Sequence, residues 1–176
     1  MKKTLAAVAA VTLAAVPLLG ASSALASNKT GNPPSCYPNC EGVTSTAGYW
    51  ARNANMPNGN FASSDWSGST LTKAKLKNST FEGANVSSAR MTKVNAQSVN
   101  FSGANLQGSD LYKANLSSAN LTGANLTGAN LTKVNLKKAN LTNANLTGAD
   151  IKKAKFKQAT FNNTTCPDGT VTNTGC

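Results

Sequence analysis

The sequence has no histidine, and only six acidic residues stand against 17 basic ones among its 176 residues. Without histidine there is no imidazole for acid–base chemistry, no histidine ligand for a metal ion and no Ser–His–Asp triad. Six scattered carboxylates also leave little material for paired acid–base catalysis. We therefore expect a protein that is not an enzyme and that uses no metal or cofactor.

Long apolar segments are absent beyond the N-terminus, and the run from residue 5 to 19 is short for a membrane span. Two lysines precede this run, and residues 24–26, Ala-Leu-Ala, form the small-residue pattern of a cleavage site. The pattern predicts a signal peptide at 1–26 and no membrane span in the mature chain. We expect a secreted product, extracellular or associated with the cell wall, whose 15 basic and six acidic residues give a charge of +9.

Cysteine is limited to four residues in the flanks of the chain, Cys36, Cys40, Cys166 and Cys176. In an exported protein, an even number of cysteines predicts disulfides. Three pairings are possible, and we favour Cys36–Cys40 and Cys166–Cys176 because each pair lies in its own turn-rich segment. The spacings C-x3-C and C-x9-C fit a zinc site poorly.

Proline is absent between Pro57 and Pro167, and a repeat with a period of five fills this segment. Steps of five from Phe61 to Phe161 give 21 positions, and all of them are apolar. The residue two before each is small (Ala thirteen times, Ser four, Val three, Gly once), and the residue directly before is Asn twelve times and Asp three. We number the places of each unit so that the small residue is first, Asn or Asp second and the apolar residue third.

A period of five suits neither an α-helix nor a flat strand. Residues five apart on a helix are rotated by about 500°, so the apolar positions would spread around all its sides. The frequent Asn, Thr and Gly residues also lower helix propensity. A solenoid resolves the conflict if each unit forms one short side and a corner, because every third-place residue then points inward.

The pattern Ala-(Asn/Asp)-Leu-x-x, clearest in residues 119–133, resembles that of the pentapeptide-repeat family over residues 54–163. The resemblance implies an all-β solenoid, a right-handed four-sided parallel β-helix with four units per coil and about five coils. Lys75, Arg90 and Lys155 depart from the second-place pattern, and Ala96 is a small third-place residue.

The flanks complete the expected organisation. Residues 27–53 would be a linker and N-terminal loop or cap, with Tyr49 and Trp50 covering the first coil. Residues 164–176 would be a C-terminal disulfide loop or cap. It would leave the coil at Cys166-Pro167-Asp168-Gly169 and cover the last exposed strand edge.

Lysines give independent support for four sides, because Lys73, Lys93, Lys113, Lys133 and Lys153 all hold the fifth place and are spaced by twenty. We name the sides after their first third-place residues, Met56, Phe61, Trp66 and Leu71. Every basic residue of the repeat then falls on two adjoining sides. The Leu71 side carries Lys73, Arg90, Lys93, Lys113, Lys133, Lys152 and Lys153, and the Met56 side carries Lys75, Lys77, Lys137, Lys138, Lys155 and Lys157.

This asymmetry predicts binding of a polyanion at the cell surface, such as a wall polymer, an acidic polysaccharide or extracellular nucleic acid. The candidate contacts are Lys73, Lys93, Lys113, Lys133, Lys153, Lys137, Lys138 and Lys157. The alternative is an inert or protein-interaction scaffold in which duplication copied the lysines and they serve only solubility.

The sequence also bears on two other functions. Some pentapeptide-repeat proteins resemble duplex DNA and protect topoisomerases, but the basic charge and export signal of this chain argue against a DNA-mimic role. The Asn- and Thr-rich half permits, by spacing alone, a neutral sugar or ice as ligand.

Overall fold

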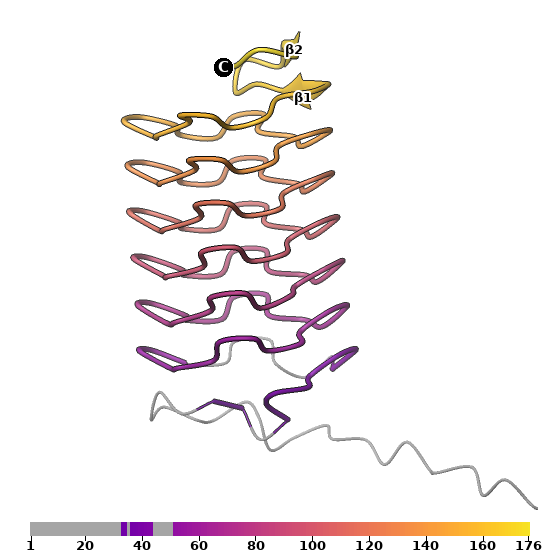
Figure 1. Ribbon diagram of the computed structural model, residues 1–176, viewed down its shortest axis with the longest axis vertical. Helices are drawn as coiled ribbons and strands as arrows, with labels where there is room; N and C mark the ends of the chain where they lie inside the picture. The colour runs from indigo at the N-terminus through magenta and orange to yellow at the C-terminus, as the bar shows by residue number, and fades with distance from the viewer. Residues whose placement is uncertain (1–32, 35, 44–50) are drawn as a thin grey trace, which may run out of the picture.

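The computed structural model describes residues 33–34, 36–43 and 51–176. The expected signal peptide at 1–26 lies outside the described residues, as do Tyr49 and Trp50. Figure 1 shows the described chain as a column of similar coils stacked along the long axis, with the C-terminus at one end.

Parallel pairing between residues twenty apart defines the architecture. Such bridges form an unbroken series from Asn55 paired with Lys75 to Asn145 paired with Thr165. Because twenty residues are four units of five, each coil has four sides, and each side pairs with the same side of its neighbours. The chain is therefore a four-sided parallel β-helix.

Each side is very short, with one bridging residue in the second place. The N–H of a third-place residue donates to the next coil, as from Leu121 to the Asn140 carbonyl at 2.8 Å. A turn follows, in which the Ala124 N–H donates back to the Leu121 carbonyl at 3.0 Å. The fifth-place residue of this turn has a positive φ, 66° at Gly123, which is the feature that type II turns require.

Two longer strands lie at the C-terminal end. Strand β1, Thr164–Thr165, pairs with strand β2, Val171–Thr172, in an antiparallel ladder with Thr164 opposite Thr172 and Thr165 opposite Val171. Within the described residues these are the only strands longer than one residue. They form a small hairpin over one part of the last coil.

The core is a column of third-place side chains, as the period of five predicts. Phe61, Phe81 and Phe101 stack with ring centroids 4.7 and 5.2 Å apart, and all three are fully buried. Trp66 is also fully buried, and its indole N–H donates to the Ser64 hydroxyl at 2.8 Å. The core therefore satisfies the one polar atom of its largest side chain.

The N-terminal coil begins earlier than residue 54. Ala51 is fully buried, and its N–H donates to the Thr70 carbonyl at 2.8 Å, so residues 51–53 occupy a unit of the Leu71 side. The segment 36–43 is likewise packed on the helix, because Cys40 is fully buried and its N–H donates to the Asn60 carbonyl at 2.6 Å. The linker and N-terminal loop or cap expected at 27–53 thus includes two segments that pack on the β-helix. Neither segment has the repeat pattern, so the sequence did not indicate these contacts.

The C-terminal coil also continues beyond residue 163. Cys166 holds a third-place position at 5% exposure, and the Pro167 carbonyl accepts from the Gly148 N–H at 2.8 Å. The turn therefore leaves the coil after Pro167 instead of at Cys166. A buried disulfide sulfur takes the place of leucine there, because Cys166 is bonded to Cys176.

At the other end, the Cys36–Cys40 disulfide closes a short loop. Tyr37 in this loop stacks on Phe61 with centroids 6.4 Å apart, and its hydroxyl donates to the Pro57 carbonyl at 2.7 Å. An aromatic ring thus covers the N-terminal end of the phenylalanine column.

Candidate functional site

The candidate lysines of the Leu71 side lie at the outer corner of successive coils. Parallel pairing places equivalent residues about 4.8 Å apart along the rod. All five side chains are exposed, and their φ values are 59°, 58°, 57°, 60° and 59° for Lys73, Lys93, Lys113, Lys133 and Lys153. The structure therefore brings these five sequence-predicted residues together in one line, which we call the lysine edge.

Lysine is an unfavourable choice for this backbone. A left-handed conformation costs a residue with a Cβ roughly 1–2 kcal/mol, whereas glycine has no such penalty and Asn tolerates it. The equivalent corners of the Phe61 side use Gly83, Gly103 and Gly123, all with positive φ. Conformational preference therefore does not explain why the Leu71 side has lysine at this place in every coil from 73 to 153.

The Met56 side adds a second group of cations beside this edge. Lys137, Lys138 and Lys157 are exposed, as are Lys75, Lys77 and Lys155. The extra N-terminal unit adds the exposed Arg52 to the Leu71 side. All the candidate contacts thus lie on two adjoining sides, which we call the basic half.

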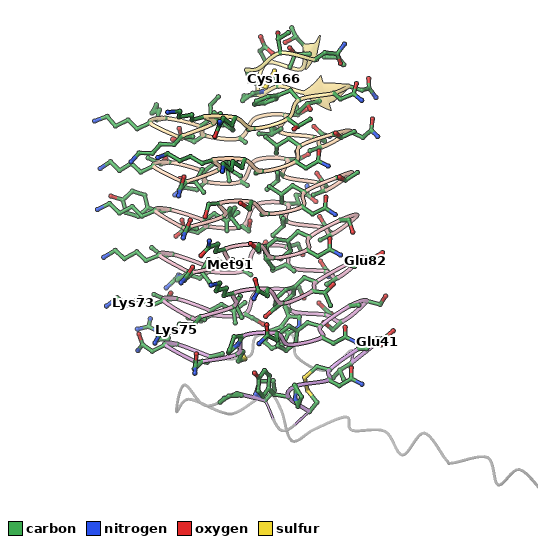
Figure 2. The ribbon with its side chains drawn as sticks, in the orientation of Figure 1. Glu41, Lys73, Lys75, Glu82, Met91 and Cys166 are labelled. Carbon is green, nitrogen blue, oxygen red and sulfur yellow. A yellow bond between two sulfur atoms is a disulfide. The ribbon has the colours of Figure 1, made fainter. Side chains whose placement is uncertain are left out.

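Two glutamates lie on the side of the rod opposite the lysines. In Figure 2, Lys73 and Lys75 project from one side, whereas Glu41 and Glu82 project from the opposite one. The Glu41 and Glu82 carboxylates accept hydrogen bonds from the Asn60 and Asn100 side chains at 3.0 and 3.1 Å. The rod is therefore polarised across its width, which the sequence analysis did not predict for these two glutamates.

Asparagine ladders occupy the half opposite the lysines. The Asn120 amide donates to the Asn100 oxygen at 3.0 Å, and the Asn120 oxygen accepts from the Thr122 hydroxyl at 2.7 Å. The Asn125 oxygen accepts from the Thr127 hydroxyl in the same way at 2.6 Å. These donors are used inside the protein, which argues against a regular array of free donors for a neutral sugar or ice.

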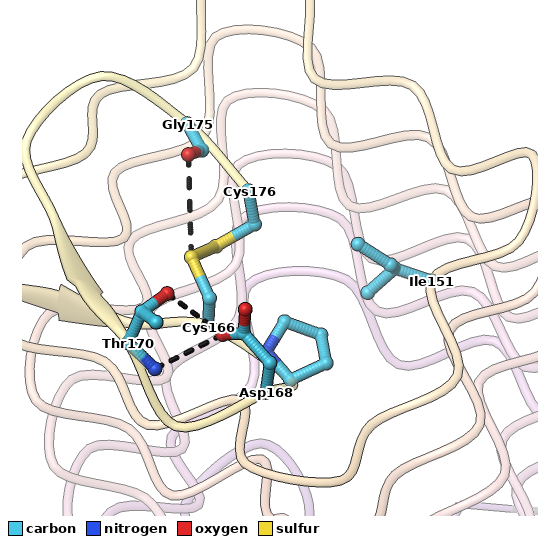
Figure 3. A pocket seen from close by; sticks show the side chains of 7 residues that line it. Ile151, Cys166, Asp168, Thr170, Gly175 and Cys176 are labelled. Atoms are coloured by element: carbon cyan, nitrogen blue, oxygen red, sulfur yellow. Dashed lines mark hydrogen bonds between the residues drawn. A yellow bond between two sulfur atoms is a disulfide. The ribbon is translucent and has the colours of Figure 1, made fainter.

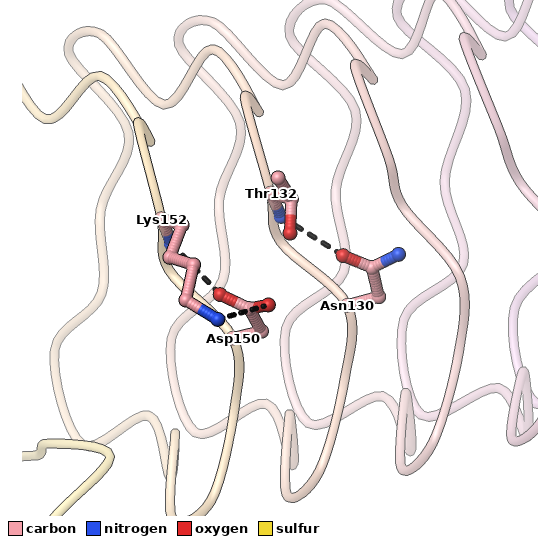
Figure 4. A network of polar contacts seen from close by, with 4 residues as sticks. All are labelled: Asn130, Thr132, Asp150 and Lys152. Carbon is pink, nitrogen blue, oxygen red and sulfur yellow. Dashed lines mark hydrogen bonds and ion pairs between the residues drawn. The ribbon is translucent and has the colours of Figure 1, made fainter.

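Asp150 lies within the basic half, but its carboxylate makes its contacts within its own turn. Its carboxylate accepts from the Lys152 N–H at 3.0 Å and pairs with the Lys152 ammonium at 3.5 Å (Figure 4). The Lys152 N–H is the main cause that lowers the pKa of Asp150 below its usual value, and partial desolvation opposes it. One coil earlier, the neutral Asn130 makes the same contact with the Thr132 N–H at 3.1 Å.

Asp110 is also held by local hydrogen bonds. Its carboxylate accepts from the Asn130 amide at 2.9 Å and from the Thr92 hydroxyl at 3.0 Å. Across residues 33–34, 36–43 and 51–176, Lys152–Asp150 is the only ion pair. No carboxylate of the described residues therefore forms an ion pair with a lysine of the lysine edge.

Tyr112 is a candidate that the sequence analysis missed. Its half-buried ring lies 5.1 Å from the Lys113 ammonium and 5.6 Å from that of Lys133, which also donates to the Tyr112 hydroxyl at 3.5 Å. Lys113, followed by Lys133, lowers the pKa of the Tyr112 phenol below its usual value. The sequence does contain a signal for Tyr112. It is an aromatic residue in the fourth place, next to a fifth-place lysine that has a second lysine twenty residues further on.

A hollow of about 390 Å³ lies at the C-terminal end, lined by Ile151, Cys166, Pro167, Asp168, Thr170, Gly175 and Cys176. Figure 3 shows Ile151 across this hollow from the disulfide. The Asp168 carboxylate accepts from the Thr170 hydroxyl at 2.7 Å, and this contact is the main cause that lowers its pKa. Asp168 is the one acidic side chain among the residues that line the hollow.

The part of the chain that the structure describes contains no cluster of three or more His, Cys, Asp or Glu side chains arranged to hold a metal ion. It also contains no helix with the length and apolar character needed to cross a bilayer.

Comparison with known proteins gives a family match along the repeat. The family model described as pentapeptide repeats matches in eight copies, over residues 54–92, 89–132 and 124–163. No curated protein sequence matches significantly.

One solved structure similar to this chain is HetL, a pentapeptide repeat protein involved in heterocyst differentiation regulation in the cyanobacterium Nostoc. The two sequences are 26% identical, and the alignment covers 71% of this chain and 67% of HetL with a TM-score of 0.44. QnrB1, a plasmid-mediated fluoroquinolone resistance protein, has 25% identity over 69% of this chain and 64% of that chain, with a TM-score of 0.43. A pentapeptide repeat protein from the Arabidopsis thaliana thylakoid lumen has 34% identity over 58% of this chain and 64% of that chain, with a TM-score of 0.26. The match thus spans about two thirds of the length of these proteins.

Proposed function

This chain belongs to the pentapeptide-repeat family, and we propose that it is a non-catalytic binding module. We propose that its basic half binds a polyanion. Membership also implies the right-handed winding that was expected from the family resemblance. The observation that carries the proposal is that the basic residues of the repeat stack on two adjoining sides of the β-helix. Such a surface presents a regular line of positive charge along the rod.

Electrostatics supports this function because the lysine edge has a cost. Ammonium groups about 5 Å apart repel each other by close to 1 kcal/mol in water, although salt and flexible side chains reduce this. The left-handed backbone of the same five lysines adds strain. A polyanion would relieve the repulsion, and its condensed counterions would be released on binding.

The kind of partner follows from the side chains. Lysine ammonium groups on flexible stems act as point charges and accept phosphate, carboxylate and sulfate oxygens alike. Arginine, whose guanidinium group offers paired donors, occurs only at positions 52 and 90, so lysine makes up most of the basic half. We therefore propose binding without sequence specificity to a wall polymer, an acidic polysaccharide or extracellular nucleic acid.

The cellular site is part of the same proposal. The expected signal peptide at 1–26 and the two disulfides, Cys36–Cys40 and Cys166–Cys176, support an exported protein in an oxidising compartment. We propose that the mature chain acts outside the cell or at its wall, where anionic polymers are exposed.

A charge-transplant variant tests the proposal directly. It combines Lys93→Gly, Lys113→Gly and Lys133→Gly with Gly83→Lys, Gly103→Lys and Gly123→Lys, so that the net charge stays the same. The receiving glycines have positive φ, as the lysines do, and a Cβ at Gly103 or Gly123 meets nothing within 4 Å. We expect weaker retention on immobilised heparin or nucleic acid, because the three transplanted lysines then lie apart from the remaining cations of the basic half.

Retention is measured across a salt series, with the parent chain and Lys→Ser variants of the lysine edge beside the transplant. The parent should elute later and show the steeper salt dependence, since each lost phosphate contact reduces the slope by about 0.9 for duplex DNA. Equal retention of parent and transplant would show that net charge alone decides. In that case the lysines serve solubility, and the chain is a scaffold.

A further inference from the structure

The C-terminal cap covers only one half of the last coil. Thr165 stacks on Asn145 of the Trp66 side, and β2 pairs with β1 directly over that side. The Asn163 N–H on the Phe61 side donates to the Asn173 side chain at 2.7 Å. Residues 149–158, the last units of the Leu71 and Met56 sides, have no further coil over them, and we call them the open edge.

Four backbone donors along the open edge have no partner within the described residues. One coil earlier, the N–H groups of Leu131 and Lys133 donate to the carbonyls of Asp150 and Lys152, both at 2.8 Å. The equivalent N–H groups, those of Ile151, Lys153, Phe156 and Gln158, lack an acceptor in the described chain. The donors of Ile151 and Lys153 on one side, and those of Phe156 and Gln158 on the next, each present the pattern of a short unpaired strand edge, which readily accepts another chain.

Apolar side chains along the open edge are incompletely covered. Ile151 and Phe156 are half-buried, whereas Leu131 and Leu136 in the same places one coil earlier are fully buried. Ile151 also borders the hollow beside the Cys166–Cys176 disulfide (Figure 3). The edge thus combines free donors with uncovered core side chains.

We propose that the open edge binds an extended acidic segment of another protein, which adds to it as a further strand. Strand addition draws affinity from main-chain hydrogen bonds and specificity from alternate side chains. Inward side chains of the segment would cover Ile151 and Phe156. Its outward carboxylates would lie near the exposed lysines at the edge, Lys152, Lys153, Lys155 and Lys157.

Charge decides against a second copy of this chain in that place. Two open edges packed together would bring both sets of these four lysines to one junction, and like charges that face each other destabilise a strand pair. An acidic segment has the opposite effect. The site uses the end of the rod, and it shares Lys152, Lys153, Lys155 and Lys157 with the proposed polyanion surface, which runs along its length.

Fluorescence anisotropy with a short labelled peptide of alternating glutamate and valine tests the proposal. Ile151→Pro removes an N–H that makes no hydrogen bond within the described protein, whereas Ile151→Ala shortens the side chain and keeps the N–H. We expect binding to weaken by about tenfold more in Ile151→Pro than in Ile151→Ala, the effect of about one strong hydrogen bond lost. Thermal melting checks that both variants fold, and heparin retention should stay unchanged in both.

A matched pair of charge variants tests the acidic preference. Lys152→Ser with Lys155→Ser removes a fourth-place and a second-place lysine at the open edge, and Lys77→Ser with Lys75→Ser removes the same two places near the other end. We expect only the first pair of substitutions to weaken binding of the peptide. A control peptide in which lysine replaces each glutamate should not bind. Equal binding to the parent and Ile151→Pro would overturn the proposal, as would a dimer of the parent that Ile151→Pro dissociates.

Discussion

Lys73 and Lys93 occupy the same corner of successive coils, and both have a left-handed backbone, with φ of 59° and 58°. Asn53 holds that corner one coil earlier, with φ of 57°. Asparagine and glycine suit such a backbone better than lysine does. The lysine edge therefore lowers the stability of the fold in two ways, through strain in the left-handed backbone and through repulsion between the ammonium groups.

Replacing an edge lysine should consequently make the protein more stable. Lys93→Asn should raise the free energy of unfolding by up to about 1 kcal/mol, since asparagine relieves part of the left-handed strain and the substitution removes one charge. Urea unfolding measures the change. Lys77→Asn is the control, because Lys77 loses the same charge but has no positive φ. If the free energy of unfolding rises equally in both variants, backbone strain at the corner does not contribute.

The inward direction of the third place can be tested at Leu121, which is fully buried. Leu121→Lys should unfold the coils, because an unpaired ammonium in the narrow core has no hydrogen-bond partner. Leu121→Ala should cost about 2–5 kcal/mol through lost contacts and a cavity. Circular dichroism during heating gives the readout, with the exposed Ser118→Lys as control. A Leu121→Lys variant that melts like the parent would contradict the core assignment.

How much of this was predictable depends on how strictly each segment keeps the repeat. The third-place column and the lysine edge follow from spacing alone, so Trp66 and Lys113 lie where the sequence placed them. The period fixes which residues face inward, and the twenty-residue spacing fixes which of them stack. Both properties are local and repeated, so one register describes the whole column.

Features that do not follow the five-residue repeat could not be predicted from the sequence. Ala51 and Cys40 pack on the first coils although their segments lack the Asn-Leu pattern, because a buried position requires only a small or apolar side chain. The half-covered last coil depends on where the chain turns after Pro167, and no period encodes that turn. Tyr112 was missed because it contacts lysines from two coils, which requires knowing how the fourth and fifth places lie in space.

The C-terminal disulfide should hold the cap on the last coil. Cys166 and Cys176 are ten residues apart, and closing a loop of that length stabilises by about 2–3 kcal/mol on chain-entropy reasoning. Cys176→Ser should therefore lower stability and speed amide exchange near Leu146, which donates to the Thr165 carbonyl. Exchange near Leu106 should stay slow. Free thiols at both positions in protein from the exported fraction would count against the bond.

Asp150 should make stability depend on pH in acid. Because the folded pKa of Asp150 is lowered, its contribution is present above the unfolded value and is lost as pH falls through the folded one. The loss should therefore occur below about pH 4, where an unperturbed Asp is protonated. Asp150→Asn keeps the turn contact that Asn130 makes but carries no charge. Unfolding midpoints should fall less steeply with acid in this variant, and parallel curves would rule the effect out.

Tyr112 should report occupation of the lysine edge. Lys113 and Lys133 lower the pKa of its phenol because their positive charges and hydrogen bonds favour the phenolate. Lys133→Ser should therefore raise that pKa, and so should heparin bound to the parent, because sulfate groups near the ammonium ions offset their charge. Ultraviolet difference titration follows the phenolate, and Tyr112→Phe identifies which part of the signal belongs to Tyr112. High salt should reverse the heparin effect by releasing the polymer. If heparin is retained on the protein while the Tyr112 titration stays unchanged, the polymer binds elsewhere, and the lysine edge around Tyr112 is not its site.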